Sequence, residues 1–248
     1  MLLQDKVAVI YGAGGAIGGA VADAFAAEGA RVFRTGRSPA DGVAVLDALD
    51  EPAIEAHLQD VVDQAGRVDI SFNAIGLPDA GIIGQELLEL AAERFAEPVA
   101  AYTTSYFLTA RLAARHMVRQ GAGVIMTVTA LPARSGTRLN GGYGTAVAGK
   151  EALTRDLSAE LAPHGIRVVG LRPHGLPETG TMRDVYDAKA EALGISWEQF
   201  QGYLAGTTHP RRTMAVAEVA GVAAFVASDR ASGLTGTTVN LTLGSLDD

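Results

Sequence analysis

The chain of 248 residues contains no cysteine, has only 6% aromatic residues and shows no excess of basic side chains. The absence of cysteine excludes disulfides, thiolate metal sites and cysteine nucleophiles, and it fits a reducing cytoplasm. The formal net charge of −8 and the pI near 5.1 disfavour nucleic acid and anionic lipid as partners. No apolar run reaches the length of a membrane span, and residues 1–5 leave no room for a signal peptide. We therefore expect a soluble, cytoplasmic protein with neither a membrane nor a nucleic-acid partner.

A glycine-rich turn follows the first apolar run. Residues 6–11 are typical of a strand, and residues 12–18 (Gly-Ala-Gly-Gly-Ala-Ile-Gly) lead into a helix. The first glycine allows a sharp turn, the middle pair lets backbone approach a phosphate, and the last lets helix and strand pack closely. Free N–H groups and the positive dipole end favour a pyrophosphate there, although a plain turn in any α/β protein remains the alternative. The residues expected to cradle the phosphates are Gly12, Gly14, Gly15, Ile17 and Gly18.

Short runs rich in Val, Ile, Leu and Phe alternate with Ala-rich helical stretches along the chain. This alternation predicts a Rossmann-type, doubly wound α/β domain of seven mostly parallel strands, with residues 1–248 forming a single domain. The predicted strands are Lys6–Tyr11, Arg31–Thr35, Val43–Leu46, Asp69–Asn73, Gly123–Thr129, Arg167–Leu171 and Thr238–Leu243. The predicted helices are Ile17–Glu28, Glu51–Gln64, Glu93–Gln120, Tyr143–Leu161 and Ala217–Ala227.

A long polar insertion, Pro177–Thr213, interrupts the alternation after the sixth strand. One helical piece is expected within it, around Ser196–Leu204. Loops at the carboxyl ends of strands in an open α/β sheet can close over a ligand. We therefore expect a substrate lid, with a simple surface excursion as the alternative.

Several segments together resemble the short-chain dehydrogenase/reductase family over essentially the whole chain. The glycine loop resembles that family's nucleotide loop, with Ala16 in place of a usual glycine. Asn73-Ala-Ile-Gly76 is similar to its Asn-Asn-Ala-Gly signature, and residues 151–168 and 234–244 resemble its central helix with the sixth strand and its C-terminal strand. The resemblance implies a dinucleotide-binding fold and an NAD(P)-dependent oxidoreductase. The cofactor contacts that it implies are Asp47 at the adenine, Asn73, Gly76, and Thr179 at the nicotinamide carboxamide.

The end of the second strand bears on the choice of cofactor. An acid at this point would bind the ribose 2′-hydroxyl of NAD, but the residues here are Arg34-Thr-Gly-Arg37. Either arginine could make a charge-assisted contact with a 2′-phosphate. Resemblance to members that prefer NADP favours Arg37, whereas ordinary solvated arginines remain the alternative. We expect NADP(H), with NAD as the second choice.

The resemblance supplies only part of a catalytic set. The family uses a Tyr-x-x-x-Lys pair with a serine and an asparagine, and Tyr143 falls in the place of the tyrosine, which is the acid or base on the substrate oxygen. The lysine position is Val147, the serine position is Ala130 and the asparagine position is Tyr102.

Two nearby residues are candidate replacements. Lys150 lies seven residues after Tyr143, about two helical turns on, and this spacing is similar to that of the enoyl-acyl-carrier-protein reductases. It would lower the pKa of the tyrosine, or it is a solvated or interface residue. Thr129 would supply the hydroxyl lost at Ala130, or it merely packs as a β-former.

The expected function is an oxidoreductase that transfers hydride between nicotinamide and a carbonyl, alcohol or activated alkene of a small-molecule substrate. One alternative is a non-catalytic relative that acts as a partner or regulatory subunit. Another is an isomerase or lyase that uses His174, which otherwise is a plain turn residue. The histidines and carboxylates show no metal-ligand spacing, so we expect no metal site.

The resemblance also implies a homo-oligomer, a tetramer or a dimer, built through the two long central helices. Small residues in the second of these helices, Ala146, Ala148 and Gly149, would permit close approach of helices from different subunits.

Overall fold

A sheet of seven strands in the order β3-β2-β1-β4-β5-β6-β7 forms the centre of the computed structural model, which describes residues 1–77 and 83–247. All neighbouring strands pair in parallel, which confirms the expected Rossmann-type, doubly wound class. The strands are β1 (Val7–Tyr11), β2 (Arg31–Gly36), β3 (Val43–Val45), β4 (Ile70–Asn73), β5 (Gly123–Val128), β6 (Ile166–Pro173) and β7 (Thr237–Leu241). Every residue of β1 is buried, because helices cover both faces of a parallel sheet.

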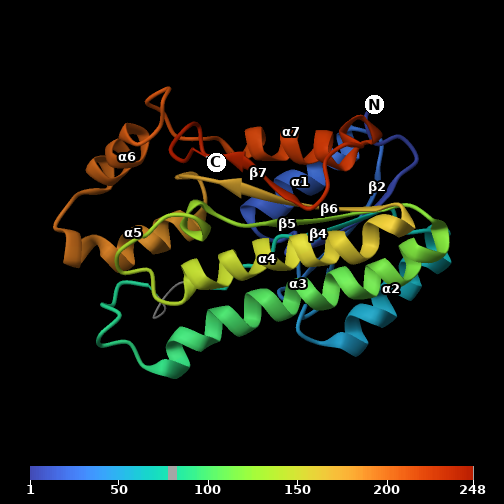
Figure 1. Cartoon of the computed structure of the whole chain (residues 1–248), viewed down its shortest axis with the longest axis horizontal. Coiled ribbons are helices and arrows are strands. Elements are labelled where there is room, and N and C mark those ends of the chain that lie inside the picture. Colours follow the sequence, from blue (N-terminus) through green and yellow to red (C-terminus); the bar gives the residue numbers. More distant parts are fainter. Residues whose placement is uncertain (78–82, 248) are drawn as a thin grey trace.

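Helices cover the two faces of the sheet in two groups (Figure 1). On one face lie α1 (Ala16–Ala27) and α7 (Val216–Ala227), whose alanines and valines pack on the sheet residues Ala8 and Ile10. On the other face α2 (Glu51–Ala65), α3 (Ala92–Gln120) and α4 (Tyr143–Leu161) enclose the second core. Because successive side chains of a strand point to opposite faces of the sheet, each strand contributes to two separate apolar layers.

Local signals fix where these helices begin and end. The Asp50 side chain accepts a hydrogen bond from the Ala53 amide at the start of α2, and Gly66 ends that helix in a left-handed conformation with φ of 78°. Gly121 ends α3 in the same way, with φ of 70°. Three short 3₁₀ turns also occur in the described chain, at Leu131–Ala133, Ala162–His164 and Asp229–Ala231.

The insertion after β6 is more regular than the sequence suggests. It contains α6 (Trp197–Gly206), as expected, but also α5 (Gly180–Leu193), which corrects the expectation of a single helical piece. Thr179 caps the start of α5 through its side chain, and Gly194 ends it with φ of 64°. These two cap residues are the signal that could have revealed the helix in the sequence.

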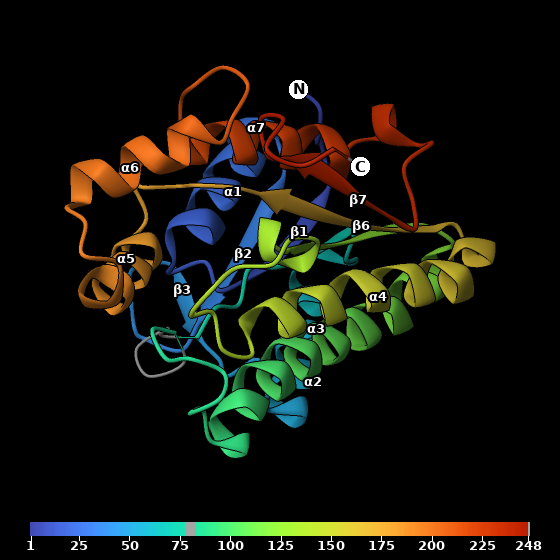
Figure 2. The same ribbon diagram turned by 60° about the vertical axis from the view of Figure 1, so that its left-hand side comes forward.

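The chain reverses its winding at β1, because β2 and β3 lie on one side of it and β4 to β7 on the other. Ligands of open α/β sheets bind outside the carboxyl ends of the strands at such a switch point. Both α5 and α6 lie on the side of the molecule toward which β6 points (Figure 2).

Candidate active site

A cavity of about 1030 Å³ opens along the carboxyl edge of the sheet. The loops that follow β1, β2, β4, β5 and β6 line it, and α5 and α6 close it from the other side. It brings together most of the residues expected at the site. Those that line it are Gly12, Gly15, Ile17, Gly18, Arg37, Asp47, Gly76, Thr129, Tyr143 and Thr179. Gly14, Asn73 and Lys150 lie outside its lining among the described residues.

The glycine loop has the shape that a pyrophosphate requires. A Cβ on Gly12 would lie 2.7 Å from the Ala74 carbonyl oxygen, and one on Gly18 would lie 2.3 Å from the Gly12 carbonyl oxygen. Side chains at these two positions would therefore force the loop apart. Gly15 precedes α1, and no side chain caps that helix. The first residues of α1, Ala16 to Gly18, line the cavity, and no side chain of the described residues caps their N–H groups, which fits an anionic ligand.

The two arginines at the end of β2 differ in their surroundings. Arg34 donates to Asp23 Oδ1 at 2.7 Å, so its charge is already paired on the surface. Arg37 is exposed and lines the cavity, and it forms no ion pair within the described part of the chain. Its guanidinium is therefore available to a phosphate at this edge.

The remaining cofactor candidates take three kinds of position. Asp47 and Gly76 line the cavity, and Asp47 Oδ1 accepts from the Leu49 amide at 2.9 Å. Asn73 is buried under the loop after β4, and its Oδ1 accepts from the Ile75 amide at 3.4 Å. Thr179 lines the cavity, but its hydroxyl donates to the Leu176 carbonyl and accepts from the Met182 amide.

Tyr143 is the first residue of α4 and lines the cavity. Its ring meets the ring of Tyr102 edge to face, with centroids 5.8 Å apart and an interplanar angle of 80°. Val147, one turn further along α4, also lines the cavity. Val147 therefore makes this wall apolar at the position where the family's usual pattern has a lysine.

Lys150 lies behind this wall and is 1% exposed. Its Nζ donates to Asn73 Oδ1 at 3.2 Å and lies 5.7 Å from the ring centroids of both Tyr102 and Tyr106. Burial lowers the pKa of Lys150 to about 7. The lysine is thus neither solvated nor part of the cavity lining, and the ring of Tyr102 lies against both Lys150 and Tyr143.

Tyr102 connects these groups, a role that sequence reasoning did not find. Its phenol oxygen accepts a hydrogen bond from the Leu77 amide at 3.2 Å, so it holds the loop that forms one cavity wall. Its ring lies against Tyr143 on one side and Lys150 on the other. A tyrosine in place of an asparagine carries no sequence signal for such a role.

Thr129 belongs to a buried polar cluster beneath the cavity. Its hydroxyl has one proton and two acceptors in reach, Glu151 Oε1 at 3.0 Å and the Leu171 carbonyl at 3.3 Å. Glu151 accepts two hydrogen bonds from Arg172, at 2.7 and 2.9 Å, and both side chains are at most 3% exposed. The hydroxyl of Thr129 is therefore directed toward this ion pair in the present arrangement.

The described residues also bear on metal and membrane sites. No group of three or more metal-ligating side chains occurs in residues 1–77 and 83–247. Over the same residues, no helix combines the length and the apolar character needed to cross a membrane.

The fold and the cavity define a dinucleotide-binding α/β protein, and comparisons with known proteins specify its family. A family model described as enoyl-(acyl carrier protein) reductase matches residues 12–245. The 3-oxoacyl-(acyl-carrier-protein) reductase FabG of Escherichia coli K12 is 28% identical over 256 residues, covering 98% of either chain. The chain therefore belongs to the short-chain dehydrogenase/reductase family, whose members are NAD(P)-dependent oxidoreductases.

Solved structures agree with this assignment. Sorbitol-6-phosphate 2-dehydrogenase SrlD from Erwinia amylovora has a TM-score of 0.89 and 25% identity, covering 97% of this chain and 100% of that one. A variant of actinorhodin polyketide ketoreductase with NADPH has a TM-score of 0.88 and 26% identity, covering 99% of this chain and 100% of that one.

Proposed function

We propose that the protein is an NADP(H)-dependent oxidoreductase that transfers hydride between nicotinamide and a carbonyl, alcohol or activated alkene. The observation that carries this proposal is one cavity lined by the glycine loop, by Arg37 and by Tyr143. A cofactor in this cavity and a substrate beside Tyr143 would share a single enclosed space. The small-molecule substrate would lie under α5 and α6, the lid helices.

The residues around the glycine loop fit a dinucleotide phosphate. The uncapped N-terminus of α1 would hold the pyrophosphate, and Arg37 would bind the 2′-phosphate because Arg34 is already paired with Asp23. The NADPH in the related ketoreductase structure supports the same choice. When bound, the cofactor supplies or accepts the hydride.

Tyr143 would give a proton to the substrate oxygen in reduction and take it in oxidation. Lys150 is placed to act on it only indirectly, through the ring of Tyr102. In its protonated form, Lys150 would favour the tyrosinate form of Tyr143 from behind that ring. Thr129 would fix the strand end through Glu151. Lys150 and Thr129 are thus positioning residues in this proposal.

A second candidate function is favoured by the position of Lys150. Because its ammonium lies behind the cavity wall and Val147 stands in front, the protein could bind the nucleotide without catalysing hydride transfer. Such a protein would serve as a partner or regulatory subunit. A nucleotide-binding titration followed by activity assays separates the two functions.

The test is a fluorescence titration with NADPH and NADH, followed by assays with a panel of ketones and enones. We expect NADPH to bind more tightly than NADH, and Arg37→Ala to weaken NADPH binding about tenfold or more while NADH binding changes little. Arg34→Ala is the matched control and should leave both affinities unchanged. Tyr143→Phe should lower turnover at least a hundredfold without affecting NADPH binding.

Three other results would contradict parts of this proposal. NADPH binding without turnover of any substrate would favour the non-catalytic function. Equal losses for Arg37→Ala and Arg34→Ala would contradict the assignment of the 2′-phosphate contact. Absence of binding by either nucleotide would overturn the proposal.

A further inference from the structure

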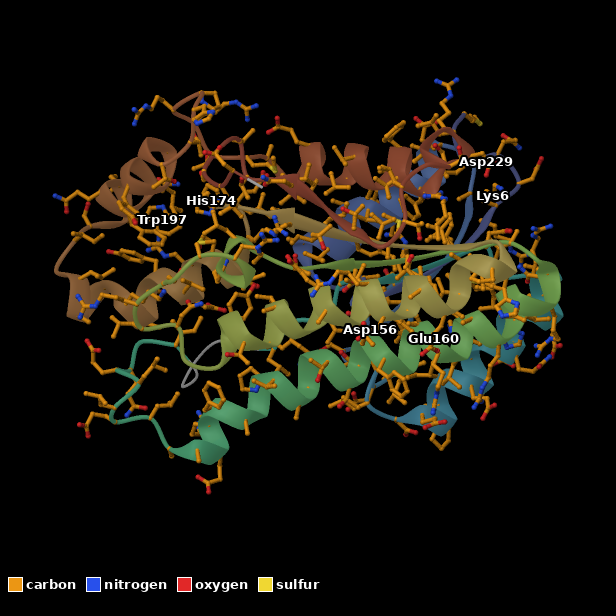
Figure 3. The ribbon with its side chains drawn as sticks, viewed as in Figure 1. Lys6, Asp156, Glu160, His174, Trp197 and Asp229 are labelled. Atoms are coloured by element: carbon orange, nitrogen blue, oxygen red, sulfur yellow. The ribbon has the colours of Figure 1, made fainter. Side chains whose placement is uncertain are left out.

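A histidine is tied to the lid at the end of β6. His174 is half-buried, lines the cavity and follows the last residue of the strand. Its Nε2 lies 3.1 Å from Thr207 Oγ1, just after α6, and Thr207 Oγ1 is 3.4 Å from Ser245 Oγ near the C-terminus. Figure 3 shows His174 close to Trp197, at the end of the molecule where α5 and α6 lie.

The partners of Thr207 determine which ring nitrogen carries the proton. Thr207 Oγ1 has a single proton and lies 2.8 Å from the Leu204 carbonyl, which can only accept, so the arrangement that makes both contacts has the hydroxyl donating to Leu204 and accepting from His174. The proton of a neutral ring therefore lies on Nε2. Burial lowers the pKa of His174, which favours that neutral ring. The other nitrogen, Nδ1, is then a bare hydrogen-bond acceptor.

This acceptor belongs to a residue that lines the cavity. Nδ1 forms no hydrogen bond with the part of the chain that the structure describes, and it is not among the polar atoms sealed from solvent without a partner. Apolar lid residues, among them Phe200 and Leu204, line the same cavity. A donor on a bound molecule would therefore meet one oriented acceptor in a largely apolar surrounding.

We propose that His174 Nδ1 accepts a hydrogen bond from a hydroxyl group of the substrate, so that the enzyme selects carbonyl compounds that also carry a hydroxyl. This inference rests on the proposed function. Through Thr207 and Ser245 the ring lies against the end of α6 and the C-terminal segment, which is the lid side of the cavity where the proposed function puts the substrate. A site built for one hydroxyl discriminates strongly against the analogue that lacks it.

The first part of the test requires no turnover. Nitrogen NMR of the histidine rings should show His174 with its proton on Nε2, identified by the signal that disappears in His174→Phe. Thr207→Val removes the acceptor and should populate the other tautomer. A wild-type ring protonated on Nδ1 would overturn the inference.

The second part identifies the donor. In the NADPH complex, 2-hydroxycyclohexanone should shift the Nδ1 resonance and cyclohexanone should not. A shift caused by NADPH alone, with none added by the hydroxyketone, would make the cofactor carboxamide the donor and would overturn the inference.

The third part uses catalysis. We expect kcat/KM to favour 2-hydroxycyclohexanone over cyclohexanone about tenfold to a hundredfold, and His174→Phe to abolish this preference while cyclohexanone reduction persists. His164→Phe, at the other end of β6, is the matched control. If both ketones are reduced with no preference, the role of His174 is overturned but the proposed function stands. If NADPH binds and neither ketone is reduced, the proposed function is overturned, and the shift of the Nδ1 resonance then decides the role of His174.

Discussion

At the scale of single residues, the unusual feature is a lysine enclosed by aromatic rings. Lys150 contacts Asn73 and two tyrosines but lies outside the cavity lining. The ring faces attract an ammonium, and the amide oxygen accepts one of its protons, yet burial still disfavours the charged form. The buried lysine therefore lowers the free energy of unfolding, while its contacts hold Asn73 and Tyr102 in place.

Replacement of Lys150 by methionine should increase stability at low pH. Burial moves the pKa of Lys150 from 10.5 to about 7, so between these values the unfolded chain binds more protons and wild-type stability rises with pH. Lys150→Met removes this dependence. We expect it to be more stable at pH 6 by on the order of a few kcal/mol, with the difference shrinking toward pH 10. Urea unfolding at several pH values measures this, and a constant difference would contradict it.

The buried ion pair under the cavity also gives a prediction. Glu151 accepts two hydrogen bonds from Arg172 and one from Thr129, all below the surface. Glu151→Gln keeps the shape but removes the charge that compensates the guanidinium. It should lower the free energy of unfolding by about 3 kcal/mol.

The control for that variant is Glu160→Gln, on the exposed side of the same helix (Figure 3). It should change stability by less than about 0.5 kcal/mol. If the two variants unfold at the same urea concentration, the ion pair does not stabilise the strand end.

At the scale of elements, the lid depends on close contact with the loops opposite it. Lys189 in α5 donates to Asn140 Oδ1 at 3.0 Å, and both side chains are buried. The Gly84 amide donates to the Leu139 carbonyl at 2.9 Å. A Cβ on Gly84 would lie 2.3 Å from the Ala188 carbonyl oxygen in α5. The backbone of the lid therefore packs directly on this glycine.

Gly84→Ala should loosen α5 from the body of the protein. The added methyl group meets a backbone atom that cannot move independently, and φ of +103° is unfavourable for alanine. We expect faster proteolysis within α5 and a loss of stability of about 2 kcal/mol. Gly194→Ala is the control, because φ there is +64° and no atom lies within 4 Å of the added Cβ. Equal proteolysis of the two variants would show that the Ala188 contact does not hold the lid.

At the scale of the whole molecule, the homotetramer remains a prediction. Gly149 is one of the small residues expected at the contact between subunits, but it has a role inside the subunit. A Cβ on Gly149 would lie 2.9 Å from Thr103 Cγ2 in α3. Its small size is therefore explained by packing of α3 on α4 within one chain. The outer face of α3 still carries exposed Phe107, which a partner subunit would cover.

Light scattering at micromolar concentration tests the assembly. We expect the mass of four chains, or of two, and a monomer would contradict the prediction. Phe107→Glu should dissociate the oligomer if the long helices form the contact, because it places a charge in an apolar interface. Phe225→Glu, at an exposed phenylalanine of α7, is the matched control.

The sequence by itself determined the order of strands and helices, since apolar periodicity and turn residues act over short distances. It also indicated the glycine loop, because glycine alone suits the contacts at Gly12 and Gly18. Helix α5 was missed although Thr179 and Gly194 cap it, because its many polar residues are also typical of a surface loop. The tertiary structure alone decided that Arg34 is paired with Asp23 while Arg37 has no ion pair among the described residues, and that Lys150 lies outside the cavity lining. Such contacts join residues far apart in the chain, and side-chain direction depends on packing between elements that local sequence does not encode.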